Sequence, residues 1–189
     1  EYTTGFKHGL TSAPELVITK QIDGAGVWYC INDNNGSNDR LTLNTIGGFT
    51  TDQYFDMDST TISTGYSTGA YDMVAYAFHS VDGYQKVGEY TGDSYSDVTV
   101  TTGFRPRFVM IKTKYSSGGW TMYDDERQDF DLFQARALQA NQSSVEWGSS
   151  FDAYYGIKAT STGFIVQHYD GGNDTTSKDN KKYLYLAIA

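Results

Sequence analysis

The chain lacks the features that would crosslink it or anchor it in a membrane. Its 189 residues include one cysteine, Cys30, so no disulfide can form within the chain. No apolar run approaches the roughly 20 residues that a membrane-spanning helix requires. The N-terminus shows no charged segment leading into an apolar one, as a secretion signal would. A chain of this length can bury enough surface to fold without a disulfide or a metal. We therefore expect no membrane insertion.

Positive charge is also scarce. Lys and Arg number 14 against 23 Asp and Glu, which gives a net charge of -9. Such a surface repels phosphate backbones and anionic lipid, so we expect no nucleic-acid partner. The first residue is Glu1 rather than Met, from which we expect that the chain was cut from a longer polypeptide.

The residue types that are frequent in the chain favour β-structure. Tyr occurs 16 times and Gly 20 times, with only 2 Pro, and long amphipathic segments rich in Ala and Leu are missing. Tyrosine and threonine with frequent glycine are typical of short strands and tight turns. Only residues 126–140 show apolar residues near helical spacing, which predicts one short helix there. We predict an all-β fold, an antiparallel β-sandwich or a jelly-roll-like arrangement.

The sequence also repeats itself. Residues 14–20 (PELVITK) match residues 106–112 (PRFVMIK), and Trp28 matches Trp120 at the same separation of 92 residues. The segment Glu1-Tyr2-Thr3 matches Glu89-Tyr90-Thr91 at a separation of 88. We predict two tandem homologous repeats, residues 1–84 and 85–189, each forming its own small sandwich. A single sandwich in which the two copies supply opposite sheets is the alternative.

Each predicted repeat contains the same hairpin. Proline suits the first residue of a strand because it lacks an N–H, and an apolar run follows it. A glycine-containing turn then leads to a second strand headed by tryptophan. The predicted core residues are Pro14, Trp28, Pro106 and Trp120. Cys30 aligns with Met122, which indicates a small core residue rather than a metal ligand.

A series of motifs lies at residues 88–92 (GEYTG), 102–106 (TGFRP), 108–112 (FVMIK), Trp120 and Tyr123-Asp124. With these motifs the chain resembles a repeat domain of unknown function found in tail-fibre-like and other virion proteins of marine phages, including cyanophages. The resemblance covers nearly the whole chain and is stronger in the second repeat. The first repeat departs from the pattern before Pro14 and after Trp28. The resemblance implies a place on a phage particle as a tail fibre, an appendage or a capsid decoration. It carries over no catalytic residues.

Two patterns typical of enzymes occur in the sequence. Residues 65–69 (GYSTG) match the nucleophile pattern of serine hydrolases, and His79 and His168 lie downstream. That pattern needs a strand before the serine and a helix after it, and a closing apolar strand follows instead. The carboxylates of residues 124–126 could form a glycosidase pair, but beside Arg127 they are more simply an exposed turn with an ion pair. We therefore predict that the chain is not an enzyme.

Candidate binding residues lie in two loops. Asp33, Asn35 and Asp39 supply oxygen atoms that calcium prefers, although the spacing is not that of an EF-hand and an ordinary turn has the same composition. Calcium is therefore the only cofactor left open. Trp147, Tyr154 and Tyr155 are the candidate contacts to a ligand, because Trp147 has no counterpart in the other repeat.

The leading hypothesis is a non-enzymatic virion module, extracellular or on the particle surface, with an adhesive role in host attachment. We expect other virion proteins as partners and self-association, because such proteins sit on symmetric particles. A carbohydrate-binding or carbohydrate-cleaving receptor module, with a host surface glycan as its partner, is the alternative. A second alternative is a self-assembling surface protein, on the premise that the apolar C-terminal strand forms an edge that needs cover.

Overall fold

The computed structural model describes residues 5–33, 38–48, 50–51, 55–64, 72–114, 117–133, 136–144, 146, 156–168 and 176–189. These residues form strands and turns and contain no helix, and every strand pair is antiparallel. In this part of the chain no helix could therefore cross a membrane. The predicted all-β, antiparallel fold is confirmed.

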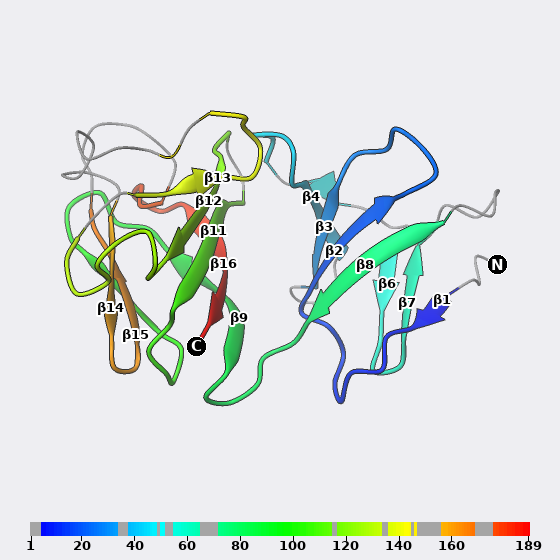
Figure 1. Cartoon of the computed structure of the whole chain (residues 1–189), viewed down its shortest axis with the longest axis horizontal. Coiled ribbons are helices and arrows are strands. Elements are labelled where there is room, and N and C mark those ends of the chain that lie inside the picture. The colour runs from blue at the N-terminus through cyan, green and yellow to red at the C-terminus, as the bar shows by residue number, and fades with distance from the viewer. Residues whose placement is uncertain are drawn as a thin grey trace. The chain divides into compact units, whose positions relative to one another are not determined.

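The chain divides into two compact units. Unit 1 comprises residues 1–44 and 49–79, and unit 2 comprises residues 45–48 and 80–189. The division thus falls between His79 and Ser80, whereas the repeat pattern placed the boundary between residues 84 and 85. Figure 1 shows the strands of both units.

The described residues of unit 1 form two sheets. Its five-stranded sheet has the order β5-β4-β3-β2-β8, and its three-stranded sheet has the order β1-β7-β6. The larger sheet contains β5 (Thr50–Thr51), β4 (Asn38–Thr42), β3 (Tyr29–Asp33), β2 (Leu16–Gln21) and β8 (Met73–Phe78). The smaller sheet contains β1 (Gly5–Lys7), β7 (Thr61–Thr64) and β6 (Phe55–Met57).

Unit 2 has the same arrangement of a five-stranded and a three-stranded sheet, in the orders β13-β12-β11-β16-β9 and β10-β15-β14. The larger sheet contains β13 (Leu138–Gln139), β12 (Trp120–Asp124), β11 (Phe108–Thr113), β16 (Lys182–Ile188) and β9 (Gln85–Thr91). The smaller sheet contains β10 (Val98–Thr101), β15 (Gly163–Val166) and β14 (Ile157–Thr160). In Figure 1, β14 and β15 lie against one face of the larger sheet.

Each unit has its own apolar core between its two sheets. In unit 1 the core joins Val17 and Ile31 of the larger sheet to Phe55, Met57 and Ile62 of the smaller one. The core of unit 2 is larger and rich in aromatic rings. It contains Tyr90, Val100, Phe104, Val109, Ile111, Tyr123, Phe130, Ala137, Ile157, Ala159, Phe164, Val166, Tyr183, Tyr185 and Ala187. Two apolar inner faces packed together make each unit a small β-sandwich.

The opposite face of each five-stranded sheet carries buried residues as well. Leu16, Cys30 and Leu41 of unit 1 lie on that face and are almost fully buried. In unit 2 the corresponding face carries the buried residues Met110, Lys112, Trp120, Leu184 and Leu186. Burial of Cys30 confirms that it is a small core residue.

The two predicted hairpins have matching registers. Ile18 lies opposite Cys30, and Met110 lies opposite Met122. The backbone N–H of Trp28 donates to Oδ1 of Asn44, at 3.2 Å. In unit 2 the N–H of Trp120 donates to Oδ1 of Asn141, at 2.8 Å.

The predicted core residues differ in burial. Pro14, Pro106 and Trp120 are buried, and Trp120 is 1% exposed. The prediction for Trp28 needs correction, because this residue is only partly buried. Trp28 precedes β3 and follows an exposed turn at residues 22–26, whereas Trp120 lies within β12, opposite Lys112.

The helix predicted over residues 126–140 is wrong. The described residues of this segment form turns and β13. Asp124 accepts a hydrogen bond from the backbone N–H of Arg127, and Asp129 accepts one from that of Asp131. Such side-chain acceptors compete with helical hydrogen bonds and favour turns.

The premise about the C-terminal strand is also wrong. β16 lies between β11 and β9 and is therefore an interior strand. Sequence pattern identified β16 as a strand, but strand order depends on long-range pairing. Among the described residues of unit 1, the corresponding strand β8 does lie at an edge.

Candidate functional site

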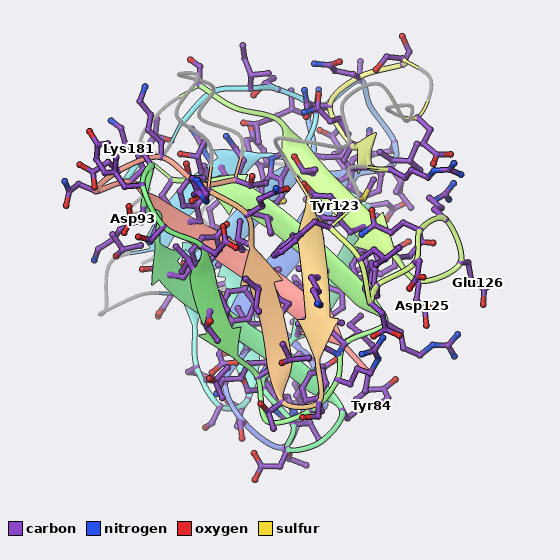
Figure 2. All side chains as sticks on the ribbon, turned by 90° about the vertical axis from the view of Figure 1, so that its left-hand side faces the viewer. Tyr84, Asp93, Tyr123, Asp125, Glu126 and Lys181 are labelled. Atoms are coloured by element: carbon purple, nitrogen blue, oxygen red, sulfur yellow. The ribbon has the colours of Figure 1, made fainter. Side chains whose placement is uncertain are left out.

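A polar depression in unit 2 is the candidate site. It has a volume of ≈ 600 Å³ and is lined by Arg105, Asp125, Glu126, Arg127, Gln128, Asp129, Phe130 and Arg136. Figure 2 shows Asp125 and Glu126 at the rim of the unit, whereas Tyr123 of the same hairpin points into its interior. Three arginines and three carboxylates therefore gather where β12 ends.

The loop after β12 is held in place by backbone and side-chain hydrogen bonds. The N–H of Asp125 donates to the carbonyl oxygen of Arg107, at 3.0 Å, and this bond closes the β11–β12 pair. Oδ1 of Asp124 accepts the N–H of Arg127, at 2.9 Å, and thereby forms the turn. Short polar side chains of this kind stabilise turns by accepting neighbouring N–H groups.

Phe130 anchors the far end of this loop. Its ring is 2% exposed and belongs to the core of unit 2. Its carbonyl oxygen accepts the N–H of Ala159 in β14, at 2.7 Å. The loop thus connects the larger sheet to the smaller one. It is hydrogen-bonded to β14 of the smaller sheet through Phe130 and to the segment before β11 through Asp125.

Ion pairs organise the charges around the depression. Arg107 lies between Asp125, at 2.6 Å, and Glu126, at 3.3 Å, and Arg127 pairs with Asp124 at 2.7 Å. The hydrogen bond and the charge of Asp125 raise the pKa of Arg107. The predicted ion pair of Arg127 within this turn is confirmed with Asp124, whereas Asp125 and Glu126 pair with Arg107.

Arg105 and Arg136 are the other two arginines that line the depression. Arg105 pairs with Asp131 at 2.9 Å, and both side chains are exposed. Arg136 is exposed, and no carboxylate within the described residues pairs with it. Its five N–H donors can therefore bind a carboxylate or hydroxyl groups of a ligand.

Gln128 lies beneath the charged rim and is 4% exposed. Its Nε2 donates to the carbonyl oxygen of Ile157 at 3.4 Å. Its Oε1 has no hydrogen-bond partner among the described residues. A buried acceptor without a partner costs free energy, so a water molecule or a donor from a ligand would stabilise it.

The charged groups around the depression can bind a polar ligand. A glycosidase needs two carboxyl groups in different protonation states across a sugar. Here Asp124 pairs with Arg127, and Asp125 and Glu126 both pair with Arg107. Ionised carboxylates and guanidinium groups together offer both acceptors and donors to hydroxyl groups.

The predicted ligand contacts Trp147, Tyr154 and Tyr155 lie outside the described residues, as does the sequence Gly65-Tyr66-Ser67-Thr68-Gly69. Of the residues downstream of that sequence, His79 lies 3.4 Å from the hydroxyl of Thr11, and Nδ1 of His168 lies 2.7 Å from Asp97. The contact to Asp97 ties the end of β15 to the segment before β10.

Of the predicted calcium ligands, Asn35 also lies outside the described residues. The backbones of Asp33 and Asp39 belong to the paired strands β3 and β4, with Asn32 opposite Asp39. Across the described ranges, no three side chains of His, Cys, Asp or Glu gather as a metal site.

Sequence reasoning missed Arg105, Gln128, Asp129 and Arg136 as site residues. Arg105 stands directly before Pro106, so its position at the start of β11 could have been inferred. The segment with Gln128 and Arg136 was interpreted as helical, and that interpretation hid their shared location. The useful signal was the series of acidic residues at 124, 125, 126, 129 and 131, which is typical of consecutive turns.

Fold and site together define an all-β protein of antiparallel sandwiches with a polar, ion-paired depression in unit 2. The family described as a domain of unknown function, DUF7483, matches residues 2–189. The chain therefore belongs to this family. No curated protein matches it, and no solved structure does either.

Proposed function

We propose that the chain is a non-enzymatic structural module of a virion, with an adhesive role at the particle surface. The resemblance to tail-fibre-like proteins of marine phages supports this placement, and the module acts as a fibre, an appendage or a capsid decoration. Its partners are other virion proteins, and copies of the chain associate on the symmetric particle.

The observation that carries the structural role is the common strand order of the two units. β4-β3-β2-β8 and β13-β12-β11-β16 follow one order, as do β1-β7-β6 and β10-β15-β14. Repeated sandwiches of one type let a protein grow by adding modules while each module keeps its own core. Such growth suits an extended or decorating part of a particle.

Immunogold labelling of purified phage particles tests the placement. An antibody against the full chain is expected to label intact particles at one structural location, such as fibres or the capsid surface. Label found only in the soluble fraction of lysed host cells would contradict the proposal. A separate assay tests the proposal that the module is non-enzymatic. The chain is incubated with host polysaccharide, and release of reducing ends would show that it cleaves the polysaccharide and would contradict the proposal.

The depression in unit 2 supports a second candidate function, binding of a host surface glycan. Arg136 offers donors at the exposed rim, with no carboxylate partner among the described residues, and Asp125 and Glu126 offer acceptors. Acidic sugars fit this combination, because a planar guanidinium group binds carboxylates through two hydrogen bonds.

A glycan array tests this second function. Saturable binding of an acidic glycan is expected to be lost in Arg136→Ala and kept in Lys158→Ala, a control on a partly buried residue of β14. Equal binding by both variants would show that the depression is not the glycan-binding site. Dependence on Trp147 instead would locate binding at the loop predicted from the sequence.

A further inference from the structure

In unit 2, the turn between β11 and β12 binds a segment from a distant part of the sequence. Residues 45–48 follow β4 along the chain but belong to unit 2. The carbonyl oxygen of Ile46 accepts the N–H of Gly118, at 3.0 Å, and the ammonium group of Lys112, at 3.3 Å. The same ammonium group donates to the carbonyl oxygen of Gly118, at 2.8 Å. The turn therefore binds one backbone oxygen of the segment through two donors.

The burial of Lys112 gives this contact a physical reason. Lys112 is 0% exposed. A buried ammonium group is costly unless hydrogen-bond acceptors surround it. The carbonyl oxygens of Ile46 and Gly118 are two such acceptors. Residues 45–48 thus help to stabilise a charge within unit 2.

Unit 1 has the same kind of turn between β2 and β3. Lys20 and Gly26 precede Lys112 and Gly118 by 92 residues, the separation that aligns the two hairpins. The ammonium group of Lys20 donates to the carbonyl oxygen of Gly24, at 3.3 Å. In both units a lysine on the first strand of the hairpin therefore binds a carbonyl group of the turn.

The turn of unit 1 is uncovered. Residues 22–26 are exposed, and Lys20 is only partly buried. The N–H of Gly26 has no hydrogen-bond partner among the residues that the structure describes. This turn therefore presents to solvent the N–H that corresponds to the bound N–H of Gly118.

Hydrogen bonds to the two tryptophans align the segments that follow β4 and β13. The N–H of Trp28 donates to the side chain of Asn44, and that of Trp120 donates to the side chain of Asn141. The residue before each asparagine donates its N–H to the carbonyl oxygen of the same tryptophan. Asn44 and Asn141 therefore hold equivalent positions.

This alignment identifies the counterpart of Ile46. Ile46 lies two residues after Asn44, and Ser143 lies two residues after Asn141. Residues 142–144 are exposed. No described residue donates a hydrogen bond to the carbonyl oxygen of Ser143. Ser143 thus presents an acceptor that corresponds to the bound oxygen of Ile46.

We propose that residues 142–144 of one copy of the chain dock on the turn at residues 22–26 of a second copy. The carbonyl oxygen of Ser143 accepts the N–H of Gly26 and the ammonium group of Lys20, as that of Ile46 does for Gly118 and Lys112. The partner is a second copy because the chain carries both halves of the contact and both halves are exposed. Backbone groups make most of the contact, so the change from Ile46 to Ser143 is compatible with it.

The contact joins two different surfaces, so each copy keeps one free surface of each kind. Such head-to-tail contacts produce a filament, or a ring where the rotation closes. The inference rests on the self-association in the proposed function and names its surfaces. It does not depend on a place in a virion.

Cysteine crosslinking tests the pairing of the two surfaces. Gly26→Cys chains are mixed with isotopically labelled Ser143→Cys chains under mild oxidation, and mass spectrometry identifies the mixed dimers. Cys30 is buried and should not react. The control replaces Ser143→Cys by Ser161→Cys, at an exposed turn. Mixed dimers should form about tenfold faster than in the control, because docking raises the effective concentration of the two thiols. Equal rates would overturn the proposal.

Two substitutions of Gly26 test the hydrogen bond itself. Gly26→Pro removes the N–H and should abolish association in sedimentation equilibrium. Gly26→Ala keeps the N–H, and its Cβ would meet only ordinary contacts, 3.4 Å from Cβ of Gln21. This variant should associate like the parent chain. Equal association by both variants would overturn the proposal, and so would a parent chain that stays monomeric up to about 1 mM.

Hydrogen exchange in the parent chain needs no substitution. Exchange of the Gly26 amide should slow as the protein concentration rises, because docking protects this N–H. Exchange that does not depend on concentration would overturn the proposal. A monomeric chain whose antibody still labels virions would overturn the head-to-tail contact alone and leave the placement on the particle standing.

Discussion

Lys114 and Glu89 form an ion pair on the face of the larger sheet of unit 2 that lies opposite the core. Lys114 follows β11 and its side chain is 2% exposed, whereas Glu89 lies in β9 and is 19% exposed. β16 separates these two strands, so the pair bridges across it. The ion pair therefore couples β9 to β11 beyond the backbone hydrogen bonds.

Replacement of Glu89 should destabilise unit 2 strongly. Glu89→Gln leaves a buried ammonium group without its counter-charge, and we expect a loss of about 3 kcal/mol in the free energy of unfolding. Urea denaturation measures this loss. The control is Asp131→Asn, which breaks the exposed pair with Arg105 and should cost less than about 1 kcal/mol. Similar losses in both variants would show that burial of Lys114 does not govern the effect.

The two tryptophans should respond differently to truncation. Trp120 is 1% exposed, so Trp120→Ala should reduce the free energy of unfolding by about 3–5 kcal/mol. Trp28 is partly buried, so Trp28→Ala should cost roughly half as much or less. Chemical denaturation of both variants tests the difference. Losses of equal size would mean that the two rings make equivalent contacts despite their different burial.

Asp97 should make the stability of unit 2 depend on acid pH. Burial opposes ionisation of this carboxyl, but two hydrogen bonds and the charge of His168 outweigh it and lower the pKa of Asp97. A carboxyl whose pKa is lower in the folded state stabilises the fold above its unfolded pKa, near 3.9. This contribution is lost as the pH falls through the folded pKa.

Asp97→Asn should therefore be less stable than the parent chain at pH 7, and the difference should shrink below about pH 4. Urea denaturation at both pH values gives the comparison. Ser161→Ala, at an exposed turn, is the control and should show no pH-dependent difference. A difference between Asp97→Asn and the parent that stays constant from pH 7 to pH 3 would contradict the role of the carboxylate charge.

Local sequence predicted the hairpins well. Pro14 and Pro106 precede β2 and β11, and the tryptophan-containing segments lead into the paired strands β3 and β12. The closing apolar strand predicted after residues 65–69 is β8, Met73–Phe78. These elements depend on short-range information: a proline, an apolar run and a glycine turn.

Long-range pairing could not be inferred in the same way. β16 was correctly interpreted as a strand, but its position between β11 and β9 depends on residues about 70 to 100 positions away. The grouping of residues around the depression in unit 2 could not be predicted from local sequence either. Arg107 and Asp125 are 18 residues apart, and only the register of β11 and β12 brings them together. Trp28 and Trp120 share a sequence pattern, yet their burial differs because burial depends on the surroundings of each hairpin.

Gly163 provides a last test of packing within unit 2. It lies in β15, the middle strand of the smaller sheet, opposite Thr101 of β10 and Thr160 of β14. A Cβ atom at this position would overlap the carbonyl oxygen of Val100, which is backbone and cannot move aside without disturbing the sheet. Gly163→Ala should therefore separate β10 from β15.

We expect Gly163→Ala to lower the free energy of unfolding by about 1–3 kcal/mol, the usual cost of forcing extra atoms into a packed site. Gly47→Ala is the matched control, because the nearest atom to its added Cβ would be Oγ1 of Thr45 at 3.6 Å. That control should change stability by less than about 0.5 kcal/mol. Urea denaturation gives both values, and hydrogen exchange at Val100 and Phe164 locates the change. A neutral Gly163→Ala would mean that β10 and β15 can move apart at little cost, which would contradict the tight pairing of this sheet.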